Sequence, residues 1–334
     1  MVIRHLTLVG RALAGSRIAV AAACLGLIAA VGFAASFDAV AASRPGPGSY
    51  LVKTKTQLRA LRKELFHSLD KEQQSLERKI DYAVRPNWRV AAYASHQGGY
   101  RDVVFYGGVL AIMEFLTDAA LLERHYAAAG CVQAYMKAIV AVDKSNRKRI
   151  LTGHLPKRIP SVFEHAKAET TPCKDMAVDT FYGNPTVVEE RRALLKGGVA
   201  YLLSHEVAHH ILGHVDRWQA ADFVDFLEKR RAAESAADDW AFSRMAEIGL
   251  NPIQAFAVMM YAAATNRYSA DEERRSTHPS GAKRFRVMLK RARAMSAKGT
   301  PFRKALVRRG ELEEWNHRLK EIEQSFNKLM VAKL

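Results

Sequence analysis

The sequence predicts an α+β fold that is mostly helical and contains one small sheet. Apolar residues recur at three- and four-residue steps over several long stretches, a period that is typical of amphipathic helices. One stretch near residue 100 instead has two short strand-like runs around a glycine-rich turn. The chain has 334 residues, of which 49% are hydrophobic. This is enough for one large domain or two small ones with a well-formed core.

Residues 1–42 resemble a targeting segment. Three arginines precede an uncharged, alanine-rich run at 18–37, and small residues at 39–42 offer a cleavage site. An apolar run of about 20 residues can also remain in place as a membrane anchor. We therefore expect an exported protein whose residues 1–42 are either a cleaved signal peptide or an N-terminal membrane anchor.

Residues 43–86 are predicted to form a linker and an N-terminal helix. The sequence RPGPGS at 44–49 is rich in proline and glycine and is typical of a flexible connection. At 54–84, leucines and an isoleucine form an apolar stripe along a heavily charged helical pattern, which Pro86 ends.

Two strands are predicted next, at 87–94 and 101–106, with a turn at 97–99 between them. A helix is expected from Gly107 to residue 122.

In the region 123–196, the sequence pattern predicts a helix at 125–142, followed by loops rich in proline and threonine. Cys131 and Cys173 fall here, and they are either a disulfide pair or two separate buried thiols. We expect His154 and His165 in this region to be surface residues.

The chemistry centres on the motif His205-Glu206-Val207-Ala208-His209, which has the pattern HExxH. Apolar residues at helical spacing surround it, so His205 and His209 lie one turn apart on the same helix face and can bind one metal ion. Glu206 is close enough to take a proton from a water molecule at that metal. Burying two histidines and a carboxylate without partners would be costly, and a metal would remove that cost.

Two further histidines follow the motif without fitting a ligand position. An HExxHxxGxxH pattern would need glycine at 212 and histidine at 215, where this chain has Leu212 and Val215. His210 and His214 therefore fall off the ligand face. We expect them to be solvent-facing or hydrogen-bonded rather than metal ligands.

A carboxylate motif further along can complete the site. Glu234 and Asp238 form an ExxxD pattern at the start of a helix predicted at 232–248. Glu234 can supply the third metal ligand and leave one position open. Asp238, one turn later, can accept a hydrogen bond from a ligand histidine and fix its tautomer. Asp239 instead fits an exposed acidic face.

The remaining sequence is helical and strongly basic. Gly249 ends one helix, a second is predicted at 252–265, and residues 296–334 form a basic helical tail. The formal net charge is +17, but the basic residues are spread over the whole chain and are not interleaved with aromatic residues. We therefore expect no nucleic-acid partner, and regard an anionic membrane surface as an additional candidate partner.

Several motifs together resemble one known group of enzymes. HEVAHHILGH, then ESAADDWAFSRMAEIGLNPIQA, then Thr277-His278-Pro279-Ser280 followed by Arg284, resemble the HtpX, CAAX prenyl protease and Oma-type zinc metallopeptidases. The resemblance implies a zincin-like domain in which a small sheet lies beside the HExxH helix. It also implies that His278 lies near the metal and steadies an oxyanion, and that Arg284 pairs with an acidic group beside the site.

The resemblance also divides the chain. It places the metallopeptidase domain at 87–122 and 197–295, with 123–196 as an insertion that can cap the cleft. An edge strand beside the metal would bind an extended peptide by strand addition.

We thus expect a zinc metalloendopeptidase that hydrolyses misfolded or envelope proteins with one zinc ion per chain, held by His205, His209 and Glu234. Glu206 and His278 are the predicted catalytic residues, and Asp238 supports His205 or His209. The expected location is the periplasm, free or anchored in the inner membrane. The alternative is a zinc-binding envelope assembly factor or chaperone with latent protease activity.

Overall fold

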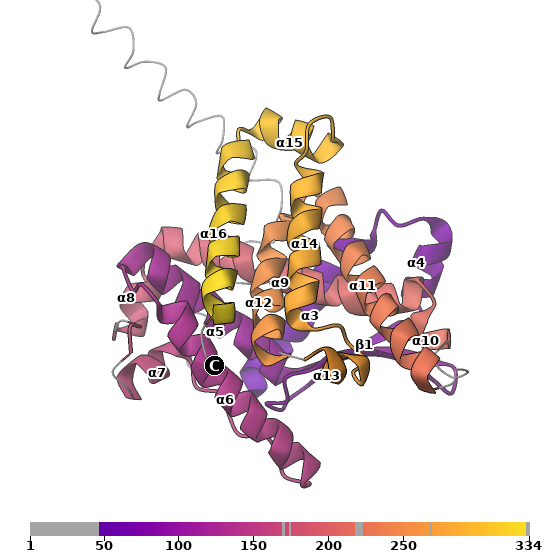
Figure 1. Cartoon of the computed structure of the whole chain (residues 1–334), viewed down its shortest axis with the longest axis horizontal. Coiled ribbons are helices and arrows are strands. Elements are labelled where there is room, and N and C mark those ends of the chain that lie inside the picture. The colour runs from indigo at the N-terminus through magenta and orange to yellow at the C-terminus, as the bar shows by residue number, and fades with distance from the viewer. Residues whose placement is uncertain (1–46, 169–170, 174, 218–222, 267–268, 332–334) are drawn as a thin grey trace, which may run out of the picture. The chain divides into compact units, whose positions relative to one another are not determined.

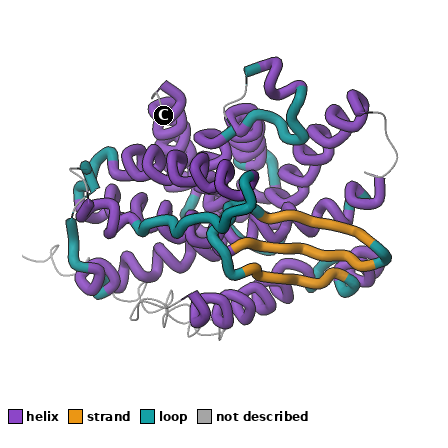
Figure 2. The backbone as a smooth tube through the Cα atoms, turned by 90° about the horizontal axis from the view of Figure 1, so that it is seen from below, coloured by secondary structure: helices purple, strands orange, loops and turns teal. Residues whose placement is uncertain are grey.

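Long amphipathic helices dominate the fold, and a three-stranded sheet lies along one side of them (Figures 1 and 2). The computed structural model describes residues 47–168, 171–173, 175–217, 223–266 and 269–331. The predicted targeting segment at 1–42 lies outside these residues. Residues 45–334 form one compact unit, which contains the predicted insertion and the predicted tail. No helix in the described ranges has the length and apolar character needed to cross a membrane.

The N-terminal part differs from the single helix predicted at 54–84. It forms two helices, α3 (Pro47–Phe66) and α4 (Lys71–Glu77), and then a strand, β1 (Ile80–Arg85). Asp70 separates the helices, because its side chain accepts a hydrogen bond from the backbone of Gln73 and so caps α4. Part of the predicted linker, from Pro47 onward, is the first turn of α3.

The sheet has the strand order β1-β3-β2, with β1 parallel to β3 and β2 antiparallel to it (Figure 2). The predicted hairpin is confirmed, but its first strand, β2 (Ala92–Gln97), begins and ends later than the predicted 87–94. It and β3 (Tyr100–Tyr106) flank Gly98 and Gly99, which have φ values of 57° and 84°. Glycine adopts such left-handed angles without a steric penalty. Because β2 is last in the strand order, it lies at one edge of the sheet.

Both helices predicted here are present with shifted bounds. The helix predicted at 107–122 is α5 (Gly107–Tyr126), and the one predicted at 125–142 is α6 (Cys131–Leu151), which begins and ends later. The chain breaks between them because Ala127 and Gly130 adopt left-handed angles, with φ values of 53° and 87°. Two short helices follow, α7 (Val162–Ala168) and α8 (Val178–Tyr182).

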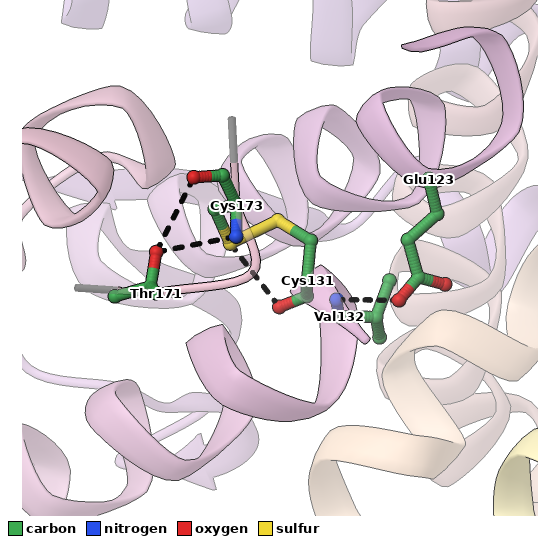
Figure 3. The surroundings of a disulfide bond; sticks show 5 residues. All are labelled: Glu123, Cys131, Val132, Thr171 and Cys173. Atoms are coloured by element: carbon green, nitrogen blue, oxygen red, sulfur yellow. Dashed lines mark hydrogen bonds between the residues drawn. A yellow bond between two sulfur atoms is a disulfide. The ribbon is translucent and has the colours of Figure 1, made fainter. Parts of the chain in front are cut away.

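A disulfide between Cys131 and Cys173 ties the loop after α7 to the first residue of α6 (Figure 3). The sequence left this pairing open. The prediction for His165 was wrong: its side chain is buried and lies against Tyr135, with ring centroids 5.6 Å apart. His154 is exposed, as expected.

The described residues from 185 onward form helices and the loops between them. They are α9 (Pro185–Ile211), α10 (His214–Arg217), α11 (Phe223–Glu247), the 3-10 helix η1 (Pro252–Ala255), α12 (Phe256–Thr265), α13 (Ala270–Arg274), α14 (Gly281–Met295), α15 (Pro301–Arg309) and α16 (Leu312–Val331). The predicted C-terminal tail is helical and also contributes to the main core. Trp315, Leu319 and Phe326 are buried there, and Phe326 stacks on Phe285 of α14 at 3.8 Å.

Close packing around α9 fixes the helix that carries the HExxH motif. A Cβ on Gly197 would lie 1.9 Å from the side chain of Gln254, and one on Gly198 would lie 2.4 Å from Met113. These two glycines let α9 approach η1 and α5 closely, so the motif is held by elements on both sides.

Candidate metal centre

The three HExxH residues lie on the buried last part of α9. Asn184 caps the start of this helix and Pro185 occupies its first turn, so its register is set well before the motif. His205, Glu206 and His209 are all buried, with residue exposures of 5%, 7% and 2%. Such burial of polar groups requires partners, and these come from other helices.

Glu234 of α11 lies next to both histidines. The Nε2 atoms of His205 and His209 are 3.3 Å apart, and they lie 3.4 Å and 3.6 Å from carboxylate oxygens of Glu234. In a tetrahedral zinc site with ligand distances of about 2.0–2.1 Å, ligand atoms are separated by about 3.3–3.4 Å. One ligand atom of each residue lies within 4.8 Å of the others, so the three residues can hold a metal ion.

Asp238 supports the first histidine from the far side of its ring. Its Oδ1 lies 2.9 Å from Nδ1 of His205, which leaves Nε2 of that ring directed at Glu234. Asp238 in turn accepts two hydrogen bonds from Arg284 of α14, at 2.8 Å and 2.6 Å, and one from the hydroxyl of Tyr201. A histidine held in this way keeps one tautomer and one ring orientation.

His214 lies beside His209 much as Asp238 lies beside His205. Its Nδ1 lies 3.1 Å from Nδ1 of His209, while the Nε2 of His209 points at the other candidate ligands. Gly213, with a φ of 66°, turns the chain after α9 and brings His214 back against the helix. His214 is buried, so the solvent-facing option is wrong for it and the hydrogen-bonded option holds.

His210 is also buried, and its side chain contacts the sheet. Its Nε2 lies 3.1 Å from the carbonyl oxygen of Asp102 in β3, and its Nδ1 lies 3.4 Å from Arg101. Arg101 makes two hydrogen bonds to Asp216 of α10, at 3.0 Å and 3.1 Å. These contacts link the end of α9 to the hairpin that contains β2.

Glu206 lies between the candidate ligands and the edge strand. Burial raises its pKa to about 7, and this effect outweighs opposing ones from His205 and from the backbone of Ala94 in β2. A carboxyl group with such a pKa can both accept and return a proton near neutral pH, as a general base requires.

The pKa values of the three candidate ligand residues are shifted in different directions. Burial acts to lower the pKa of His205, but its contacts with Asp238 and Glu234 outweigh this and raise it to about 10. Burial and the neighbouring His205 lower the pKa of His209 to about 3. For Glu234, burial opposes ionisation, yet the hydrogen bond with His205 and the nearby positive charges hold its pKa well below the ordinary value.

His278 lies at the open side of the cluster. It is in the segment between α13 and α14, its side chain is 46% exposed, and its Nε2 lies 3.4 Å from Oε1 of Glu234. The structure thus brings all six predicted site residues together: His205, Glu206, His209, Glu234, Asp238 and His278. Tyr201 and His214 join them and were not singled out as support for the site.

The part of the chain that carries this cluster also matches a known family. Residues 125–301 match the family Peptidase U49, and this range includes every one of the six residues. The chain belongs to the peptidase U49 family. Its substrates are accordingly proteins or peptides. No curated protein and no solved structure matches the chain.

Proposed function

We propose that this member of the peptidase U49 family is a zinc-dependent metalloendopeptidase whose active site is the cluster of His205, Glu206, His209 and Glu234. The observation that carries the proposal is the cluster of three buried residues, with ligand atoms within 4.8 Å of one another, beside a carboxyl group whose pKa is near 7. The kinship with HtpX, CAAX prenyl protease and Oma-type enzymes, and with it a zincin-like arrangement, is part of the same proposal.

His205, His209 and Glu234 would hold the ion, which when bound supplies a Lewis acid for the peptide carbonyl and acidifies water. Glu206 takes the proton of the attacking water and passes it to the leaving amine. His278, at the open side of the cluster, donates a hydrogen bond to the oxyanion. Asp238 and Arg284 keep His205 in its orientation throughout.

The substrate is proposed to bind as an extended segment along β2. This strand is at the edge of the sheet, and Ala94 within it lies close enough to affect the pKa of Glu206. A peptide added to this edge would therefore pass beside the general base. Misfolded or envelope proteins in an exported compartment are the proposed substrates, on the basis of the targeting-like sequence at 1–42.

The test is a comparison of Glu206→Gln with wild type on an unstructured protein substrate in the presence of zinc. The variant keeps its shape and its zinc, but we expect a loss in rate of about 100- to 10,000-fold because the general base is missing. Glu228→Gln, the same change at an exposed position of α11, is the control and should cleave like wild type.

Equal rates for Glu206→Gln and wild type would contradict the role of Glu206. If wild type binds zinc fully and cleaves no unstructured protein, the proposal of a working endopeptidase is overturned. The assembly factor with latent protease activity is then the better description.

A further inference from the structure

Two leucines, one at the end of α6 and one in the loop that follows it, are exposed to solvent. Leu151 is 87% exposed and Leu155 is 78% exposed, whereas most large apolar side chains of the described residues are buried. In Figure 1 this end of α6 projects beyond the neighbouring helices. We call residues 147–158 the α6 tip.

Hydrogen bonds hold the leucines in this exposed arrangement. The buried side chain of Asn146 clamps the returning loop, donating to the carbonyl of Lys157 at 2.8 Å and accepting from its backbone N–H at 2.7 Å. Arg149 donates to the carbonyl of Leu155 at 2.9 Å. The backbone N–H of His154 also bonds to the carbonyl of Arg149, at 2.8 Å. The tip is therefore preorganised, and ordering it costs little when it binds.

Cations outnumber acidic groups around the leucines, although Arg147 pairs with Asp143 and Arg158 pairs with Glu164, each at 2.9 Å. The tip contains Arg147, Lys148, Arg149, Lys157 and Arg158, and residues 144–163 include no acidic residue. Lys148 and Lys157 are exposed and form no ion pair with a described residue. Two exposed leucines surrounded by cations match the interface of an anionic bilayer, where apolar side chains enter the acyl region and cations meet phosphates.

We propose that the α6 tip docks the protein on the surface of an anionic phospholipid bilayer. Leu151 and Leu155 enter the boundary between headgroups and acyl chains, and Lys148 and Lys157 bind lipid phosphates. This docking is independent of the metal site, since no residue of the candidate metal centre belongs to the tip.

The experiment places a fluorescent probe on the tip of the full-length protein. Leu151→Trp is mixed with vesicles that contain bromine-labelled lipids, made either of phosphatidylcholine alone or with phosphatidylglycerol added. We expect the introduced tryptophan to be quenched beyond the background of the 4 native tryptophans, and only in the anionic vesicles. Because the signal arises at the tip, membrane contact elsewhere in the chain does not produce it.

Matched variants complete the test. Tyr100→Trp puts the same probe at the start of β3, where the native side chain is 72% exposed, and should show no quenching. In the probe background, Lys148→Glu with Lys157→Glu should weaken vesicle binding by the tip about tenfold or more. Lys304→Glu with Arg308→Glu, the same charge change on α15, should leave it within about twofold.

Absence of quenching at the tip in anionic vesicles would overturn the proposal. Equal quenching in neutral and anionic vesicles would also contradict it. So would an equal loss of vesicle binding in the two charge-reversal variants. Either result shows that the cations of the tip do not direct the binding.

Discussion

Nδ1 of His214 lies 3.1 Å from Nδ1 of His209, on the side of that ring opposite to the candidate ligands. Burial lowers the pKa of His214 to about 4, so its ring is neutral at pH 7 and can accept a hydrogen bond. His209 then carries its proton on Nδ1 and presents the lone pair of Nε2 to a metal. The relationship matches that of Asp238 with His205, so each candidate ligand histidine has its own support.

Replacing His214 with Ala should therefore weaken zinc binding about 10- to 100-fold, the usual effect of losing such a partner. His214→Asn supplies another hydrogen-bond acceptor and should recover most of the affinity. Competition with a chelator of known affinity measures both, with circular dichroism as a check of folding. His210→Ala, which removes a contact to the sheet, is the control and should bind zinc as wild type does. A full loss in His214→Asn would show that His214 acts in some other way.

Glu234 should be essential for the metal. Glu234→Ala removes one of three ligand atoms, so we expect metal analysis after purification to find little zinc in this variant. The matched control is Asp239→Ala on the same helix, where the carboxylate is exposed and pairs with Arg291 at 3.0 Å. Full zinc in Glu234→Ala would remove Glu234 from the ligand set.

Zinc binding should release a proton from His205. In the metal-free protein the pKa of this ring is about 10, so it is protonated at pH 7 and must lose the proton on Nε2 before it can bind a metal. Apparent affinity should rise by about tenfold per pH unit above pH 7 until that pKa is reached. Calorimetry in two buffers with different ionisation enthalpies counts the released protons.

The same shift predicts the stability of the metal-free protein. The pKa of His205 in the folded state lies above its value in the unfolded state. Its contribution to the free energy of unfolding is therefore complete below about pH 6.5 and is lost as the pH rises toward 10. Asp238→Asn weakens the contact that raises this pKa and should reduce both effects. Proton release equal to that of wild type in Asp238→Asn would contradict this assignment.

Gly281→Ala should disturb the site through the backbone. A Cβ at this position would lie 2.1 Å from the carbonyl oxygen of Ala262, so α14 must move away from α12. We expect a loss of about 1–3 kcal/mol in the free energy of unfolding, together with weaker zinc binding because α14 carries Arg284. Urea unfolding measures the first effect. Val287→Ala, at a 53% exposed position of α14, is the control, and a change there should stay within about 0.5 kcal/mol.

Local periodicity in the sequence was sufficient for several elements. The hairpin around Gly98 and Gly99 and the helix with His205 and His209 could be predicted, because a turn or a helix face depends on residues close in sequence. By contrast, the pattern at 54–84 suggested one helix where the chain forms α3, α4 and β1. Ile80 and Val84 became strand residues because β3 offers them a parallel partner, which local spacing does not reveal.

By itself, the sequence determined that His205, Glu206 and His209 share one helical segment and that Glu234 and Asp238 share another, because residues three or four apart lie on one helix face. Only the tertiary structure decided that the two helices face each other, with Arg284 and Tyr201 gathered on Asp238 and His214 turned back onto His209. It also decided that His165 is buried and that Leu151 and Leu155 are exposed. These features depend on packing between elements distant in the chain, and the composition of each element alone does not specify its neighbours.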